Sequence, residues 1–126
     1  PFDYDAYTRY IERFTNAGLD VHITELDVDD SGFPDALVER DRRVAEHYQR
    51  FLSAVLINPR ITELITWQLG DTHSGSHYQA LEKHGPASRR LPRPLLYDAA
   101  YERKAAWHAV AEALAKMPPR ISKSLQ

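Results

Sequence analysis

Cysteine is absent from the 126 residues, which excludes disulfides, thiol nucleophiles and thiolate metal sites. Long apolar runs are also absent, and none approaches the roughly 20 residues of a membrane span, so we expect no membrane partner. A strong charge of one sign is missing too, because the formal net charge is −2. The lack of a basic patch argues against nucleic acid as a partner. The chain begins at Pro1 without the pattern of a signal peptide, and we expect a start inside a longer sequence.

Apolar residues recur with helical or strand spacing in five segments. The clearest stripe is Val44, Tyr48, Phe51, Leu52 and Val55, which fall on one face of a helix. The five predicted elements alternate between helix and strand: 5–17, 21–26, 35–57, 61–69 and 98–116. We expect a loop over 70–94, a length that is usually functional or disordered.

This alternation predicts an α/β fold with a parallel sheet and crossover helices. Two strands cannot close a barrel, and they leave two unpaired edges. The apolar helix faces also exceed what two strands can cover. We therefore interpret residues 1–126 as a single partial domain of a larger α/β unit.

Two carboxylates stand at the end of the first predicted strand. Glu25 and Asp27 are two residues apart, so strand alternation places both side chains on one face. Like charges this close are unfavourable without a partner or a shared proton, and such pairs cluster at active sites. The residues alone leave two readings open, an active site or carboxylates that cap the next loop or pair with an arginine.

The segment 18–28, Gly-Leu-Asp-Val-His-Ile-Thr-Glu-Leu-Asp-Val, resembles the strand-7 signature of family 10 glycoside hydrolases. The resemblance implies that Glu25 is the catalytic nucleophile and that Asp27 supports the hydrogen-bond network of the active site. Residues 61–64 repeat the letters Ile-Thr-Glu-Leu. Glu63 lies near the start of its strand, however, at the face of a barrel away from the chemistry, so we expect a structural or solvent-facing role for it.

The segment 66–71, Thr-Trp-Gln-Leu-Gly-Asp, resembles strand 8 of the same family. The resemblance implies that Trp67 forms a platform beneath the sugar and that Asp71 belongs to the substrate-binding rim. We expect His73 to bind substrate there in place of the family's second tryptophan, with His77 and Tyr78 as the alternatives. The residues alone leave Trp67 open to a core role, because indoles bury well. Two positions depart from the family pattern, which has glycine where Gln68 stands and tryptophan where Gly75 stands.

The last segment agrees with this resemblance. Pro-Leu-Leu-Tyr-Asp at 94–98, followed by 101–107, is similar to the family's final segment, with Ala105 in place of a proline. The resemblance thus implies a partial (β/α)8 TIM barrel that covers helix 6, strand 7, helix 7, strand 8 and helix 8. His73 and His77 are four apart, but Gly75 separates them in a predicted loop, so we expect no metal site.

The activity implied by the resemblance is that of a retaining endo-1,4-β-xylanase, with xylan or a xylo-oligosaccharide as substrate and no cofactor. The family's acid/base glutamate follows an asparagine, and the sequence contains no Asn-Glu pair. We therefore expect this chain to supply the nucleophile half and to be inactive without the N-terminal part of the barrel, its expected partner. The alternatives are a non-catalytic carbohydrate-binding module and a self-associating half-barrel. A secreted or periplasmic location is implied by the resemblance alone.

Overall fold

The computed structural model describes residues 2–85 and 90–120. Helices and strands alternate along the chain, and the two strands are parallel. The elements are α1 (Tyr4–Asn16), β1 (Val21–Leu26), α2 (Leu37–Val55), β2 (Ile61–Thr66), the 3-10 turn η1 (Asp71–His73), α3 (Gly75–His84) and α4 (Ala105–Lys116). The predicted order of helices and strands is confirmed, with η1 and α3 added after β2.

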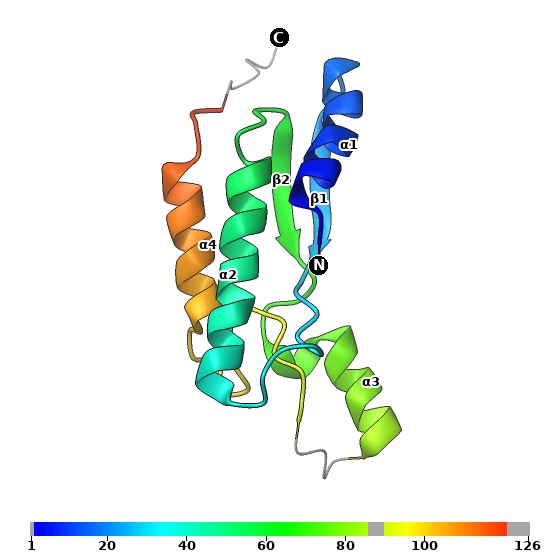
Figure 1. Cartoon of the computed structure of the whole chain (residues 1–126), viewed down its shortest axis with the longest axis vertical. Helices are drawn as coiled ribbons and strands as arrows, with labels where there is room; N and C mark the ends of the chain where they lie inside the picture. Colours follow the sequence, from blue (N-terminus) through cyan, green and yellow to red (C-terminus); the bar gives the residue numbers. More distant parts are fainter. Residues whose placement is uncertain (1, 86–89, 121–126) are drawn as a thin grey trace.

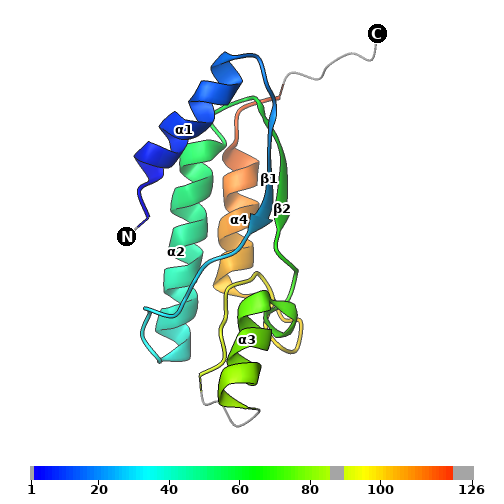
Figure 2. The same ribbon diagram turned by 90° about the vertical axis from the view of Figure 1, so that its right-hand side faces the viewer.

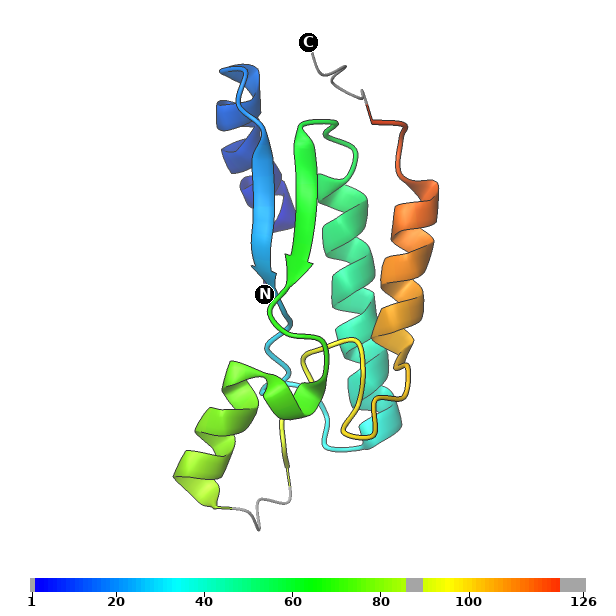
Figure 3. The ribbon, with the colours of Figure 1, turned by 180° about the vertical axis from the view of Figure 1, so that it is seen from behind.

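The sheet is covered on one side. α1, α2 and α4 all lie on the same side of β1 and β2, with α1 nearest β1 and α4 next to α2 (Figures 1 and 2). The other side of the sheet faces the viewer in Figure 3, and no helix of the described part covers it. One sheet face is therefore packed into a core, and the other is open.

The core lies between the strands and the helices. Its buried side chains come from α2, both strands and α4: Val44, Tyr48, Leu52, Val55, Ile23, Ile61, Ala106 and Val110. The predicted stripe of α2 is thus its buried face. The one hydroxyl in this stripe is satisfied, because Tyr48 donates a hydrogen bond of 2.9 Å to the carbonyl of Pro94. α2 consequently joins the strands to the long segment that precedes α4.

α1 is capped at both ends. The Asp3 carboxylate caps the start by accepting a 2.8 Å hydrogen bond from the amide of Ala6. At the other end, Gly18 has φ = 88°, and the amide of Leu19 donates to the carbonyl of Phe14 at 3.1 Å. This is the Schellman arrangement, which needs a left-handed residue after the last turn. It directs the chain from α1 straight into β1.

β2 is shorter than predicted, because it ends at Thr66 and the prediction extended it to residue 69. The amide of Gln68 turns back to the carbonyl of Thr66 at 2.9 Å, and Gln68 itself has φ = 88°. A left-handed residue cannot continue a strand. The chain therefore leaves the sheet immediately after Trp67.

The prediction of a continuous loop over 70–94 was wrong. The 3-10 turn η1 and the ten-residue helix α3 occupy its first part, and residues 86–89 lie outside the described part. Ser74 starts α3 as an N-cap, since its Oγ accepts a 3.1 Å hydrogen bond from the amide of His77. Serine is a favoured residue at this position, and Gly75 then occupies the first helical position.

The last helix starts later than predicted, at Ala105 instead of residue 98. Asp98 caps a turn, not a helix, because its Oδ1 accepts hydrogen bonds of 2.9 Å from the amides of Ala100 and Glu102. Tyr101 has φ = 59°, which excludes it from a regular right-handed helix. Ala105 therefore opens the helix at the position where the family pattern has proline.

Candidate active site

The carboxyl ends of β1 and β2 meet at one place. Leu26 pairs with Thr66 in the register of the sheet, and the amide of Trp67 donates a 3.0 Å hydrogen bond to the carbonyl of Leu26. Leu26 is the residue between Glu25 and Asp27. The two sequence segments with the predicted site residues are thus joined by the last hydrogen bond of the sheet.

Glu25 is exposed at this end of β1. Within residues 2–85 and 90–120, its carboxylate makes no hydrogen bond or ion pair. An arginine pair or a loop cap, the alternatives that the residues left open, is therefore not formed by Glu25 in the described part of the chain. A free carboxylate at this end of a parallel strand is available for attack on a bound substrate.

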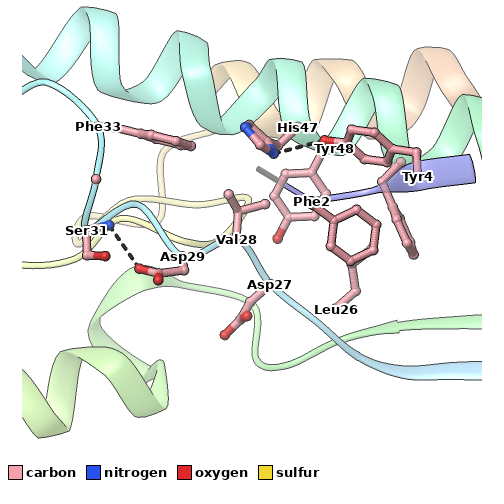
Figure 4. Close-up of a pocket in the computed structure, with 12 residues that line it drawn as sticks. Phe2, Tyr4, Leu26, Asp27, Val28, Asp29, Ser31, Phe33, His47 and Tyr48 are labelled. Carbon is pink, nitrogen blue, oxygen red and sulfur yellow. Dashed lines mark hydrogen bonds between the residues drawn. The ribbon is translucent and has the colours of Figure 1, made fainter. Parts of the chain in front are cut away.

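Asp27 lies in a different environment from Glu25. Burial raises the pKa of the Asp27 carboxyl, and the charges of Asp29 and Glu25 raise it further. Asp27 lines a cleft between β1 and α2 (Figure 4), and Glu25 does not. The register of β1 against β2 shifts between Ile23 and Leu26, just before Asp27.

The cleft beside Asp27 has a volume of about 490 Å³ and is mostly apolar. Figure 4 shows Phe2 and Tyr4 at one end, Phe33 at the other, and Asp27 at the edge. Tyr4 and His47 meet on its α2 side, where Tyr4 Oη lies 2.9 Å from Nδ1 of His47. Burial lowers the pKa of His47, so this imidazole favours the neutral form.

Trp67 is exposed. It retains 45% of its accessible surface, so the described part of the chain does not bury it in the core. A Cβ added to Gly75 would lie 3.8 Å from Nε1 of Trp67 and would touch no other atom within 4 Å. The indole therefore borders the start of α3, where Gly75 has no side chain to cover it.

Asp71 occupies a buried position. Only 3% of its surface is accessible, and its Oδ1 accepts a 2.9 Å hydrogen bond from the amide of Leu95. Nζ of Lys104 lies 2.9 Å from the other carboxylate oxygen. Burial nevertheless raises the pKa of Asp71, and the charges of Lys104 and Arg93 oppose that shift. Both carboxylate oxygens of Asp71 are thus bound to groups of the protein. The residue has a structural role in place of the sugar contact that the resemblance implied.

His73 is exposed in η1. Its Nδ1 lies 3.1 Å from both Oγ1 of Thr72 and Oη of Tyr101. His77 is buried and belongs to α3. The two histidines therefore lie in different elements and do not share one helix. Among the residues that the structure places, no group of three or more histidine, aspartate or glutamate side chains has the arrangement of a metal site.

Glu63 pairs with His22 across the sheet, with Oε2 at 2.9 Å from Nδ1 of the imidazole. Both side chains are about half exposed. They belong to the open side of the sheet, because Ile23, the next residue after His22 in β1, is buried in the core on the other side. The predicted structural or solvent-facing role of Glu63 agrees with this position.

Among the helices that the structure describes, none is long and apolar enough to cross a membrane.

Sequence reasoning missed the roles of Lys104 and Tyr101 and the backbone conformation of Gln68. Lys104 neutralises Asp71 from 33 positions away, and no local pattern pairs them. Tyr101 contacts both His73 and Gly70, where an added Cβ would come within 3.2 Å of the tyrosine ring. Gln68 was identified as a departure from the family, but its left-handed backbone is visible only in the structure.

The model of glycosyl hydrolase family 10 matches residues 2–113. The chain belongs to glycoside hydrolase family 10. Xylanase 10B from Thermotoga maritima is 26% identical with a TM-score of 0.67, and the match covers 91% of this chain and 33% of that one. The fold is also similar to that of the Penicillium canescens endo-1,4-beta-xylanase XylE, at 24% identity and a TM-score of 0.70, over 93% of this chain and 33% of that one.

Xylanase 10C from Cellvibrio japonicus is 22% identical with a TM-score of 0.76, and the match covers 93% of this chain and 27% of that one. None of the curated proteins matches the sequence. The chain therefore spans about a third of the length of the solved family 10 xylanases that it matches. Its alternating helices and parallel strands are a fragment of the TIM barrel of this family.

Proposed function

We propose that this chain supplies the nucleophile half of a retaining endo-1,4-β-xylanase, with Glu25 as the nucleophile. In this proposal α1, β1, α2, β2 and α4 correspond to helix 6, strand 7, helix 7, strand 8 and helix 8 of the barrel. The observation that carries it is the 3.0 Å hydrogen bond from the Trp67 amide to the Leu26 carbonyl. This bond joins the backbone of the exposed Trp67 to that of Leu26, the residue after the unpaired Glu25, at the carboxyl end of parallel strands, where barrel enzymes hold their chemistry.

The proposed reaction has two displacements. The Glu25 carboxylate attacks the anomeric carbon of a xylosyl unit, forms a covalent glycosyl ester and releases the rest of the polymer. A second carboxylic acid protonates the leaving oxygen and then removes a proton from the water that hydrolyses the ester. This acid comes from the N-terminal part of the barrel.

Asp27 and Trp67 support this reaction in different ways. Asp27, whose pKa is raised, holds a hydrogen-bond network in place next to the nucleophile. The exposed face of Trp67 offers a flat apolar surface to the C–H face of a xylose ring. His73 lies at the rim of the same region and contacts the sugar through its imidazole, while Tyr101 orients that ring.

The substrate of this proposal is xylan or a xylo-oligosaccharide. Support comes from xylanase 10B of Thermotoga petrophila, whose structure holds xylobiose, and from a mutant of the Cellvibrio japonicus xylanase 10C in complex with xylopentaose. Polymeric xylan lies outside the cell, so the parent enzyme acts after secretion or in the periplasm.

The test compares the chain alone with the chain supplemented by the portion of the T. maritima xylanase 10B that precedes the matched region. We expect no release of reducing sugar from xylan by the chain alone and release by the mixture. Glu25→Gln abolishes that release, and Glu63→Gln, the matched control in the repeated Ile-Thr-Glu-Leu letters, leaves it. Xylan cleavage by the chain alone, or cleavage that survives Glu25→Gln, would contradict the proposal.

A second candidate function is carbohydrate binding without catalysis, or a half-barrel that self-associates. Gln68 and Gly75 favour it, because both change the rim around Trp67. Xylohexaose binding to the isolated chain that survives Glu25→Gln and is lost in Trp67→Ala supports the binding module. Sedimentation of the isolated chain as a monomer excludes the self-associating form.

A further inference from the structure

The side chain of Arg40 is buried without enough hydrogen-bond partners. Arg40 is the fourth residue of α2, and only 3% of its surface is accessible. Among the residues that the structure describes, none accepts a hydrogen bond from its Nε or Nη1 atom, and both atoms are buried. The Asp30 carboxylate comes within 3.5 Å of Nε, which is longer than a usual N–H···O hydrogen bond. Buried donors are almost always paired in proteins, so Arg40 has donors left for a further acceptor.

The carboxylates around Arg40 are bound to other donors. Oδ2 of Asp30 accepts a 3.1 Å hydrogen bond from the amide of Arg93. The guanidinium of Arg93 binds both oxygens of Asp41, at 2.8 and 2.7 Å, and Asp71 has the partners described above. These aspartates would turn toward Arg40 only by leaving another donor unpaired.

A pocket of about 220 Å³ borders Arg40. Its lining comes from several segments: Leu37 and Arg40 of α2, Thr72 of η1, His77 of α3, and Arg93 and Ala99 before α4. Figure 1 shows the start of α2 at the same end of the molecule as α3. The volume is below the roughly 300–1,000 Å³ of pockets that hold drug-sized ligands. The pocket therefore suits a ligand of a few heavy atoms, with two arginines in its lining.

The first turn of α2 adds positive potential at this pocket. α2 begins at Leu37, which lines the pocket, and the preceding residue Ala36 offers no side-chain cap. The first amides of a helix have no partner within the helix, and its dipole places partial positive charge there. Glu39, the acid of the first turn, is already paired with Arg42 at 2.6 Å. The helix start and Arg40 thus both favour a negatively charged ligand.

We propose that this pocket binds a small oxyanion, a phosphate or a carboxylate group, through Nε and Nη1 of Arg40. The planar fork of an arginine matches two oxygens of such a group. Asp71 also borders the pocket, and the cluster itself is neutral, because three aspartates face three cations: Asp30, Asp41 and Asp71 against Arg40, Arg93 and Lys104. A bound anion therefore adds negative charge, and we expect weak binding. The site uses neither Glu25 nor Trp67, so the inference does not depend on the proposed function.

Four variants separate this pocket from the rest of the surface. Ala99→Phe fills the pocket, because Ala99 is an exposed residue of its lining, and Ala100→Phe places the same ring on the next exposed residue, outside that lining. Arg40→Lys keeps a positive charge beside Asp30 but removes the fork. Arg42→Lys makes the same change on the exposed side of α2 and is its matched control.

The experiment titrates sodium phosphate or sodium glucuronate into the 126-residue chain at constant ionic strength. It follows the ¹⁵N–¹H signal of Arg40 Nε and the midpoint of thermal unfolding, which rises when a ligand binds the folded state. We expect a saturable change in both with at least one of the two anions. Saturation by phosphate alone identifies a phosphate-type ligand, saturation by glucuronate alone identifies the carboxylate of a sugar acid, and saturation by both identifies a general oxyanion site.

The variants decide whether the binding belongs to this pocket. Ala99→Phe and Arg40→Lys raise the apparent Kd about tenfold or more, and Ala100→Phe and Arg42→Lys leave it within about twofold. If Arg40→Lys does not fold, Ala99→Phe and its control decide. The proposal is overturned if neither anion gives a saturable change, which means that Arg40 donates to water only, or if Ala99→Phe binds as tightly as Ala100→Phe.

Discussion

Nζ of Lys104 lies 2.9 Å from Oδ2 of Asp71, and both residues are almost fully buried. The ammonium also donates to the carbonyls of Arg93 and Leu95, at 2.8 and 3.0 Å. This pair ties the turn after β2 to the segment before α4. It therefore anchors the η1 turn, which contains His73 and follows Trp67 in the chain, from its buried side.

Removal of the Lys104 charge is expected to destabilise the fold strongly. Lys104→Met leaves the Asp71 carboxylate buried without its closest cation, which costs about 3–5 kcal/mol of unfolding free energy. Lys116→Met removes an exposed pair with Glu112 and should leave the unfolding free energy nearly unchanged. Urea unfolding of both variants makes the comparison, and equal losses would show that the buried pair has no special weight.

Gln68 and Gly18 offer a matched pair of backbone tests, because both have φ = 88°. A non-glycine residue in a left-handed conformation costs roughly 1–2 kcal/mol, partly offset by the larger entropy that glycine has when unfolded. We expect Gln68→Gly to stabilise the chain by up to about 1 kcal/mol. Gly18→Gln should destabilise it by about 1 kcal/mol or more. Thermal unfolding measures both, and changes of the same sign would refute the strain at Gln68.

Asp27 predicts a pH dependence of stability. Its pKa in the folded chain is raised above the unfolded value of 3.8, chiefly by burial and then by Asp29 and Glu25. An acid that holds its proton more tightly when folded contributes stability that is complete below the unfolded pKa and is lost as pH rises through the raised value. Asp27→Asn should therefore stabilise the chain at pH 7, by less than about 1 kcal/mol because solvent screens the group.

The measurement for Asp27 is the unfolding free energy of the wild type and Asp27→Asn between pH 3 and pH 7. We expect the two curves to separate as the pH rises above 3.8 and to converge below it. Curves that run parallel over this range would contradict the raised pKa. Asp29→Asn is the control of opposite sign, since hydrogen bonds from Ser31 lower the pKa of Asp29.

Much of the fold was predictable because its signals are local. The apolar residues from Val44 to Val55 recur with the period of a helix, and they form the buried face of α2. The Gly18-Leu19 pair that ends α1 is a local signal of the same kind. α3 was missed because it is a polar helix without an apolar stripe. Its one strong local signal is Ser74, the cap at its start.

The candidate site was predictable only in part. The segments that contain Glu25 and Trp67 end side by side because parallel strands end at the same edge, a property that follows from the order of elements. The burial of Asp71 depends on Lys104 and on the amide of Leu95, contacts between distant segments that no short motif encodes. The register shift between Ile23 and Leu26 in β1 is likewise not predicted by strand alternation.

The role of Glu25 is tested most directly by trapping the covalent intermediate. A 2-deoxy-2-fluoro xylobioside with a good leaving group is added to the chain assembled with the N-terminal portion of a family 10 xylanase, and the peptides are then analysed by mass spectrometry. The account predicts a fluoroxylobiosyl ester on Glu25, absent in Glu25→Gln. Xylan cleavage with the label on any other residue, Asp27 included, would contradict it.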